Sequence, residues 1–528
     1  MKQLIAVLLV TALSGWAQHT HPASAEAKPV TLIPGLGTWK HRISTTRPEA
    51  QKYFDQGLIL LYGFNRVEAV RSFRKAAELD PAAPMPWWGV SAALAPYFNM
   101  DGDPTFDIKE SCAALAKGLA LPGEPREKAY LEAANARCLD FADPSKYIDA
   151  ARKLALAYPD DLDAQVLLAE ALMLPGRWRW YTIDGKATPG MDEAERTLEA
   201  VLRRDPTHPG ANHYYIHAVE SSPTPERAVA SAQRLMGLVP AAGHVVHMPG
   251  HIWLVLGDYN MTVAVNERAA ELDRRYFAGD AANPYYMYYL HNLHFILYSR
   301  DMQGRVADVR RAEKALQDAI TPVEKAMPEM AGVFSSTITM SKLRTARWDE
   351  VLAAPKVTDD GLAAMISLYS RTVALAMKGR KAEALAEREA FEKVLAKLDR
   401  NSQWGSNKLG DVLDLASTVL AARTSDSPVP FWQKAVAIQD KLAYDEPPAW
   451  YYPVRESLGA AMLQAGDAAG AEAVFREALR RSPHNGRVLF GLLESLKPQK
   501  KTASEEAVQR EFDAAWKGAD LKLKLGEM

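Results

Sequence analysis

The stretch GLILLYGFNRVEAVRSFRKAAELDP, residues 57–81, decides the fold because its pattern recurs near the other end of the chain. The second copy is GAAMLQAGDAAGAEAVFREALRRSP, residues 459–483. In both, a glycine is followed at spacings of 12, 4, 3 and 5 residues by alanine, phenylalanine, alanine and proline. The small residues let two helices approach, the ring fills the space between them, and the proline ends the second helix. Each stretch therefore predicts a pair of antiparallel helices.

This pattern resembles the tetratricopeptide repeat, in which two helices occupy about 34 residues. The resemblance implies an all-α solenoid, a right-handed superhelix of about nine or ten repeats including degenerate ones. Strands are not expected, because apolar and polar residues seldom alternate over a useful window. The resemblance covers roughly residues 48–495 and is strongest at its two ends. Degenerate helix pairs are expected at residues 163–202 (with an insertion at 174–190), 209–239, 243–273, 284–319, 331–354 and 361–398.

The N-terminus has the features of a secretory signal peptide over residues 1–17. Lys2 supplies a positive start, residues 4–12 form a short apolar run, and small residues flank Trp16. The alternative is an uncleaved anchor, although the run is too short to span a bilayer. No later stretch reaches about 18 apolar residues without charge, so we expect no membrane span after cleavage. The sequence thus predicts a periplasmic or secreted protein with an irregular lead-in (18–47) and a C-terminal capping helix (496–528).

The composition and the missing motifs argue against several classes of function. The chain is 48% hydrophobic and 24% charged, as in folded proteins. Its net charge of −2, without a basic stretch interleaved with aromatics, argues against nucleic-acid binding. The sequence also lacks a Gly-rich phosphate loop, a Gly-x-Ser-x-Gly elbow, a His-Glu-x-x-His pair and a Cys-x-x-Cys-His haem site. An enzymatic hypothesis therefore depends on the histidines alone.

The two cysteines, Cys112 and Cys138, fall on consecutive predicted helices on either side of a turn at 121–124. Their distances from that turn differ by about five residues, or roughly 7 Å of helix rise. A disulfide needs closer alignment. We therefore expect two buried free thiols.

Histidines cluster in the middle of the chain, where eight of the twelve fall between His208 and His294. His213 and His217 are spaced i, i+4 on one predicted helix, and His247 and His251 repeat that spacing 34 residues later. The resemblance implies that these positions line a concave groove. Because packed helices lie about 8–10 Å apart, imidazoles from two of them can share a metal ion at about 2.0–2.1 Å. The spacing predicts that the four rings converge on a common point.

Other residues are candidates for the same site. His291 and His294 on the next helix could complete the cluster, and Glu170 and Glu220 could supply oxygen ligands. Glu220 is also a possible general base. A site rich in imidazole suits zinc, copper or non-haem iron. The candidate ligand-groove residues are His244, Tyr214, Asn292, Trp450, Tyr452 and Arg455; the last three would close over the histidines if the C-terminal turn curled back.

Two motifs, ANHYYIHAVE at 211–220 and HMPGH at 247–251, look like those of exported bacterial tetratricopeptide proteins of undefined biochemical role. That resemblance implies a fold and a location, but no reaction. Our leading hypothesis is an exported binding protein whose groove holds a metal ion together with a peptide, a protein or a small molecule. The alternatives are a metal-dependent enzyme, hydrolytic or oxidative, a metal-free peptide-binding scaffold, and buried histidines satisfied by their neighbours.

Overall fold

Helices dominate the computed structural model, which describes residues 29–99, 106–278, 280–281, 283–325, 327–357 and 361–528. The predicted signal peptide lies outside the described residues. Leu32–Met528 form one unit, and everything below concerns that unit. Within it the strands are β1 (Gln403–Trp404) and β2 (Asn407–Lys408), which pair in an antiparallel hairpin. None of the described helices is long and apolar enough to cross a bilayer.

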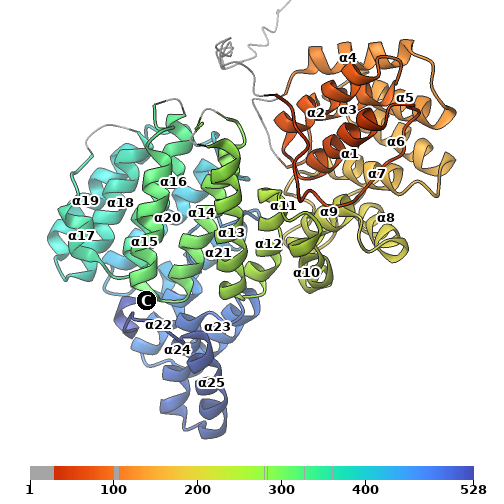
Figure 1. Ribbon diagram of the computed structural model, residues 1–528. Coiled ribbons are helices and arrows are strands. Elements are labelled where there is room, and N and C mark those ends of the chain that lie inside the picture. Colours follow the sequence, from red (N-terminus) through yellow and green to blue (C-terminus); the bar gives the residue numbers. More distant parts are fainter. Residues whose placement is uncertain (1–28, 100–105, 279, 282, 326, 358–360) are drawn as a thin grey trace, which may run out of the picture. The chain divides into compact units, whose positions relative to one another are not determined.

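The helices follow one another as antiparallel pairs (Figure 1). The N-terminal pairs are α1 (Pro48–Tyr62) with α2 (Arg66–Leu79), α3 (Met85–Leu94) with α4 (Ile108–Ala120), α5 (Pro125–Leu139) with α6 (Ser145–Ala157), and α7 (Leu162–Met173) with α8 (Met191–Arg204). The central pairs are α9 (Pro209–Glu220) with α10 (Val229–Leu238), α11 (Gly243–His247) and α12 (Pro249–Val255) with α13 (Tyr259–Phe277), α14 (Tyr286–Met302) with α15 (Val306–Ile320), and α16 (Pro328–Arg344) with α17 (Trp348–Ala353). The C-terminal pairs are α18 (Leu362–Met377) with α19 (Lys381–Leu395), α20 (Leu409–Thr424) with α21 (Val429–Gln439), α22 (Arg455–Gln464) with α23 (Ala468–Arg481), and α24 (Gly486–Leu496) with α25 (Thr502–Ala515).

The pairing confirms the predicted all-α architecture of helical hairpins. The described residues contain twelve pairs rather than nine or ten, counting the interrupted α11 and α12 as one helix. The pairs α3–α4, α5–α6 and α20–α21 lack the glycine, alanine and phenylalanine spacing, and they are not among the helix pairs that we predicted from the repeat pattern.

The two signature phenylalanines explain how consecutive pairs pack. The Phe73 ring lies so close to Gly57 on α1 and Gly89 on α3 that a Cβ at either glycine would be less than 3 Å away. Phe475 has the same relation to Gly459 on α22 and Gly491 on α24. Each ring is completely buried between the first helices of two consecutive pairs. Only a residue without a side chain fits at these glycines, which is why both copies carry the same residue types.

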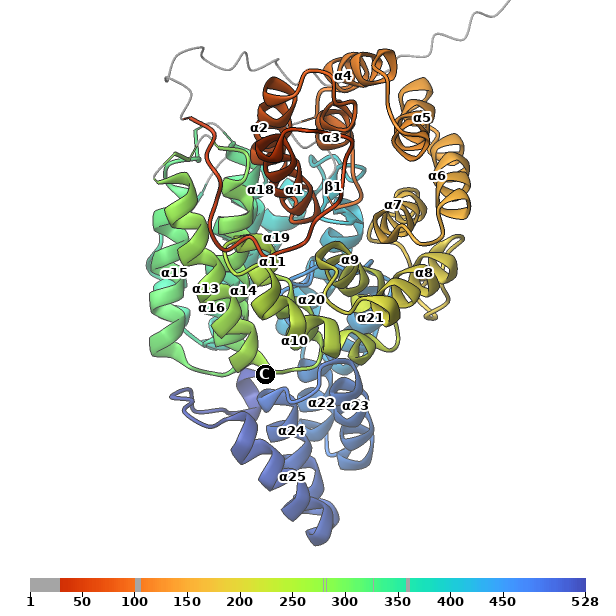
Figure 2. The same cartoon turned by 45° about the vertical axis from the view of Figure 1, so that its right-hand side comes forward.

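Buried polar contacts hold the connection between α21 and α22 against the middle of the chain. The Tyr451 hydroxyl donates to Asp301 on α14 at 2.5 Å. Arg344 on α16 forms a bidentate ion pair with Glu456 on α22, at 3.0 and 3.1 Å. Helix α14 packs beside both α13 and α16 (Figure 1 and Figure 2). The connection between α21 and α22 therefore contacts the group of helices that follows the histidine motifs in the sequence.

The prediction of two buried free thiols is wrong. Cys112 and Cys138 form a disulfide with their Cα atoms 5.7 Å apart, and both residues are partly exposed. Leu121 and Glu124, at either end of the turn, have extended backbone conformations. The turn therefore shifts the start of α5 along the axis of α4, and this shift takes up the offset of about 7 Å that the residue count suggested.

The disulfide closes a separation of 26 residues and should constrain the unfolded chain. We expect the Cys112→Ala/Cys138→Ala variant to unfold with a free energy lower by about 3 kcal/mol, measured by urea denaturation. Alkylation of the unreduced, denatured wild-type protein should add no mass. Two alkyl adducts on protein purified from an oxidising compartment would contradict the assignment.

Candidate metal centre

Six imidazoles and two carboxylates gather in the interior of the central helices. They come from α9, from α11 and α12, from α14, and from the connection between α21 and α22: His213, His217, Glu220, His244, His247, His251, His291 and Glu446. The predicted open groove is not observed for the five histidines of α9, α11 and α12, whose exposed fractions are 0–2%. Phe64, which follows α1, packs against three of them, with its ring centroid 4.5 Å from that of His213, 5.9 Å from that of His217 and 5.3 Å from that of His244.

The histidines form two groups of three. In the first triad, His213, His217 and His244 each present one nitrogen, and these atoms lie within 4.8 Å of one another. The second triad consists of His247, His251 and His291 and meets the same limit. Tetrahedral ligands around one zinc ion lie about 3.3 Å apart, so small side-chain rotations would bring either triad onto an ion.

A carboxylate joins the triads. Glu220 is completely buried and accepts from His217 Nδ1 at 2.9 Å. Its other oxygen lies 2.6 Å from His251 Nδ1. Glu446 contacts the same nitrogen of His251. The four rings that we expected to converge on one point are divided between the two triads. Of the two histidines on α11, His244 rather than His247 lies beside His213.

Hydrogen bonds fix which imidazole nitrogen carries the proton in two of these rings. His213 Nδ1 lies 2.5 Å from the carbonyl of Tyr62, which can only accept. His247 Nδ1 lies 2.6 Å from Asn266 Oδ1, and the Asn266 amide is oriented by its own bond to the Thr262 carbonyl at 2.8 Å. Both rings therefore carry their proton on Nδ1 and keep a lone pair on Nε2. The same arrangement orients histidine ligands in metal sites.

Several of the remaining nitrogens have no partner. Among the described residues, nothing hydrogen-bonds to Nε2 of His213, Nε2 of His217 or either nitrogen of His244, although all are buried. In the second triad, His247 Nε2 faces His251 Nε2 at 2.7 Å. Since His247 can only accept there, either His251 donates a proton from Nε2 to His247 or a cation binds both nitrogens. Buried polar atoms without partners are costly, and a cation in each triad would bind one nitrogen of each ring.

The protonation states of five of the six rings suit coordination. Burial lowers the pKa of His213 to about 3 and holds the pKa values of His217, His244, His247 and His291 well below their usual range. These rings are therefore neutral at pH 7, the form that binds metals. His251 differs: burial opposes its charge, but Glu446 and Glu220 raise its pKa to about 10. Burial, followed by the charge of Glu446, raises the pKa of Glu220.

Other predicted site residues have different partners. Glu170 accepts from the Tyr147 hydroxyl at 3.0 Å, lies 3.5 Å from Arg137, and belongs to none of the possible ion-binding groups among the described residues. The Asn292 amide donates to Asp273 at 2.7 Å. Tyr214 packs its ring against Tyr62 and Phe98, with ring centroids 5.9 and 5.0 Å apart.

The C-terminal aromatic segment reaches the centre through residues other than those expected. Arg455 forms a bidentate ion pair with Asp440 at 2.6 Å, and the Tyr452 carbonyl accepts from Gln439. The residue of this segment that contacts the histidines is Glu446, which we did not predict as a site residue. In the sequence, Glu446 stands out only as an acidic residue directly before two prolines. The segment around it has too little helical character for its position in the fold to be predicted. His294 and Trp450 line a cavity that also borders His291 and Glu446.

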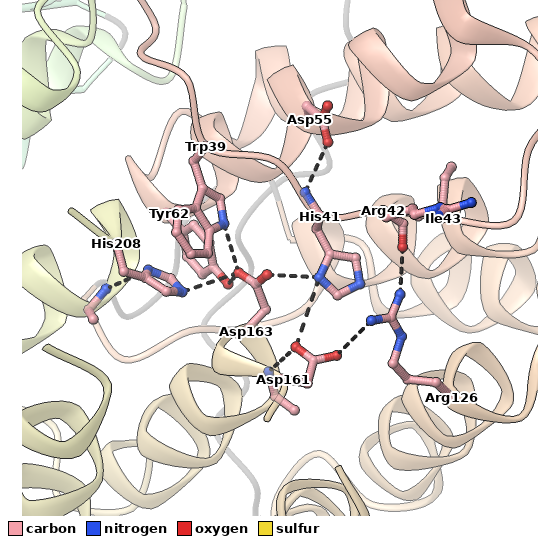
Figure 3. A network of polar contacts seen from close by, with 12 residues as sticks. Trp39, His41, Arg42, Ile43, Asp55, Tyr62, Arg126, Asp161, Asp163 and His208 are labelled. Carbon is pink, nitrogen blue, oxygen red and sulfur yellow. Dashed lines mark hydrogen bonds and ion pairs between the residues drawn. The ribbon is translucent and has the colours of Figure 1, made fainter. Parts of the chain in front are cut away.

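A separate polar network positions the first triad (Figure 3). The buried Asp163 carboxylate accepts from Trp39 Nε1 at 3.1 Å, His41 Nδ1 at 2.7 Å and the Tyr62 hydroxyl at 2.5 Å, and lies 3.3 Å from His208 Nε2. His41, Asp161 and Asp163 lie close enough to hold an ion, but the Asp163 oxygens already have donors. We interpret the network as structural.

This network connects directly to the triad. Tyr62, whose hydroxyl binds Asp163, offers its carbonyl to His213. His208, on the other side of Asp163, caps α9 by accepting from the Ala211 backbone at 3.2 Å through Nδ1. Asp163 therefore orients both the start of α9 and the acceptor that sets the His213 tautomer.

No protein-family model and no curated protein matches this chain. Similar solved structures include the APC/C hetero-tetramer Cut9–Hcn1, with a TM-score of 0.31, 11% identity, and coverage of 92% of this chain and 77% of that chain. Yeast Tom70 has a TM-score of 0.27, 13% identity, and coverage of 89% and 93%. Naa15/Naa10 bound to HypK-THB has a TM-score of 0.23, 12% identity, and coverage of 90% of both chains. At these scores the similarity carries no argument about function.

The Asp163 network predicts a pH-dependent stability. Burial opposes the charged forms, but hydrogen bonds from His208 and His41 lower the pKa of Asp163, and Asp163 raises the pKa of His41. The Asp163 contribution is present above pH 3.8, and the His41 contribution is full below pH 6.5 and is lost as the pH rises through the raised pKa. We expect Asp163→Asn to lower the unfolding free energy by about 3–5 kcal/mol near pH 6 and by less at pH 9, measured by urea denaturation.

Asp160→Asn is the matched control, because the Asp160 side chain is 97% exposed. It should change stability by less than about 0.5 kcal/mol at either pH. Equal destabilisation by the two substitutions, or an Asp163→Asn effect that grows toward pH 9, would contradict this account of the network.

Proposed function

We propose that this chain is an exported metal-binding protein that holds two transition-metal ions, one in each histidine triad. The observation that carries the proposal is the set of buried Nε2 lone pairs. Tyr62 and Asn266 hold the protons of His213 and His247 on the opposite nitrogens. A neutral packing role would leave Nε2 of His213 and Nε2 of His217 without partners, whereas an ion in the first triad would use both. In the second triad, an ion would replace the contact between Nε2 of His247 and Nε2 of His251.

The donor set narrows the choice of metal. It consists of imidazoles and carboxylates, and both cysteines of the chain are taken up in their disulfide. Such a site suits zinc, copper(II) or non-haem iron and disfavours the softer copper(I). Two buried carboxylates would offset part of the charge of two divalent ions.

Export is supported by two independent features. Residues 1–17 have the composition of a signal peptide. The disulfide between Cys112 and Cys138 is of the kind that persists in oxidising compartments and is rare in the cytosol.

The structure disfavours one of the competing hypotheses and favours another. A peptide-binding scaffold that uses these histidines is disfavoured, because a peptide cannot reach side chains that are 0–2% exposed. A metal-dependent enzyme remains the second candidate and is favoured by the cavity beside His291. In that case Glu220, in contact with both triads, is the candidate base.

Metal analysis tests the proposal. Protein purified from the exported fraction should contain about two transition-metal ions per chain by inductively coupled plasma mass spectrometry. His213→Gln should remove the ion of the first triad and His291→Gln that of the second, so each variant should retain about one ion per chain.

His484→Gln serves as the control, since His484 is exposed and distant from both triads in the sequence, and it should leave the metal content unchanged. Wild-type protein that contains no transition metal, and takes up none after incubation with zinc, copper or iron salts, would overturn the proposal. So would a metal content that His213→Gln and His291→Gln leave at the wild-type value.

A further inference from the structure

A cavity of about 240 Å³ borders the second triad. Its walls come from α14, α16, α18 and α20 and from the connection between α21 and α22, and they include His291, His294 and Glu446. We infer that this cavity binds a neutral, largely apolar organic molecule of one or two rings that carries a hydrogen-bond acceptor. The inference deepens the proposed function, on which its closeness to a metal ion rests, by naming the class of ligand presented to the centre.

The size of the cavity fits a small ring system. A cavity of about 150 Å³ lined by apolar side chains accommodates benzene, so about 240 Å³ leaves room for a second ring or a substituent. Its lining also reaches the surface. Val333 is 41% exposed, and Gly405 and Pro448 are exposed as well. The cavity therefore adjoins the protein surface at these residues.

The lining is mainly apolar and aromatic. It includes Phe334, Met365, Tyr369, Trp404, Trp450 and Tyr451. The Tyr369 and Trp450 rings meet edge to face, with centroids 5.6 Å apart, so they present a rigid aromatic corner. Rings of this kind supply much of the contact energy in small-molecule sites.

The charges around the cavity select a neutral ligand. No lysine or arginine is among the described residues that line it, so an anionic ligand would find no cation from the protein. The carboxylates of Asp445 and Glu446 would repel it. A cationic ligand gains little from Asp445, which already accepts from the Ser406 backbone and hydroxyl and from the Asn407 amide. Glu446 is held in turn by His251.

One buried donor in the wall has no acceptor from the described part of the protein. The indole Nε1 of Trp450 lacks a hydrogen-bond partner although the residue is only 5% exposed. An indole N–H can only donate, so its natural partner is an acceptor such as a carbonyl or ether oxygen. Leaving such a donor unsatisfied is costly, and a ligand oxygen would remove that cost.

The position of the cavity connects this ligand to the centre. His291 belongs to the second triad, and Glu446 contacts His251 of the same triad. Both residues also line the cavity, as does His294, whose Nε2 is buried without a partner. A molecule bound in the cavity therefore shares its walls with Trp450 and with His291 of the second triad.

Coumarin is a suitable probe, because it is a neutral two-ring molecule with a carbonyl acceptor, and coumarin-3-carboxylate is its anionic counterpart. We expect metal-containing wild-type protein to bind one coumarin by isothermal titration calorimetry. In metal-free protein, coumarin-3-carboxylate should bind at least about tenfold more weakly than coumarin, since two carboxylates line the cavity and no metal ion is there to attract the anion. Trp450→Phe should weaken coumarin binding about 3- to 10-fold by removing one hydrogen bond.

Ala416→Trp places a large side chain in the cavity and should weaken coumarin binding more than about 20-fold. Trp432→Phe is the matched control, because Trp432 is 3% exposed and lies outside the lining, and it should bind coumarin as the wild type does. Thermal denaturation checks that each variant folds, and Trp450→Phe keeps the test decisive if Ala416→Trp does not fold.

The metal content of each preparation separates the two proposals. Protein that holds metal but does not bind coumarin, or that binds it equally well as wild type and as Trp450→Phe, overturns the ligand inference and leaves the metal proposal intact. Protein that binds coumarin with the expected responses to substitution but holds no metal overturns the metal proposal alone.

Discussion

The central constraint on this protein is that neutral imidazoles are buried with their lone pairs facing one another. The five histidines of α9, α11 and α12 are 0–2% exposed, and burial holds the pKa values of His213, His217, His244 and His247 below the physiological range. Two of these rings have their protons fixed on Nδ1 by acceptors that cannot rotate away, the Tyr62 carbonyl and the Asn266 amide. We propose that an interior arranged in this way holds a cation and that the surrounding contacts orient its ligands.

The repeat architecture explains how such a centre is assembled. One repeat length separates His213 from His247, so their helices present equivalent positions on consecutive pairs. The same fold supplies the outer support. Asp163 on α7 binds Tyr62 and lies beside the cap of α9, and α13 supplies Asn266. Contacts that are distant in the sequence, such as those of Tyr451 with Asp301 and of Glu446 with His251, then close the centre from the C-terminal side.

The sequence could predict those parts that depend on local spacing. The glycine and phenylalanine pattern predicts helix pairs because Phe73 and Phe475 each fill a space that only glycine leaves open. The i, i+4 spacing of the histidines predicts that they share a helix face, because helix geometry is regular. The burial of the site could not be predicted, because Phe64 and Glu446, which contact the histidines, are far from them in the sequence. The disulfide was missed because a residue count does not show that Leu121 and Glu124 are extended.

The most direct test of the account is X-ray absorption at the metal K-edge of protein loaded with zinc. It should show nitrogen and oxygen scatterers at about 2.0–2.1 Å, with the outer-shell pattern of about three imidazoles per ion and no sulfur. An outer shell without imidazole carbon, as from hydrated or surface-bound zinc, would contradict the assignment of the metal to the two triads.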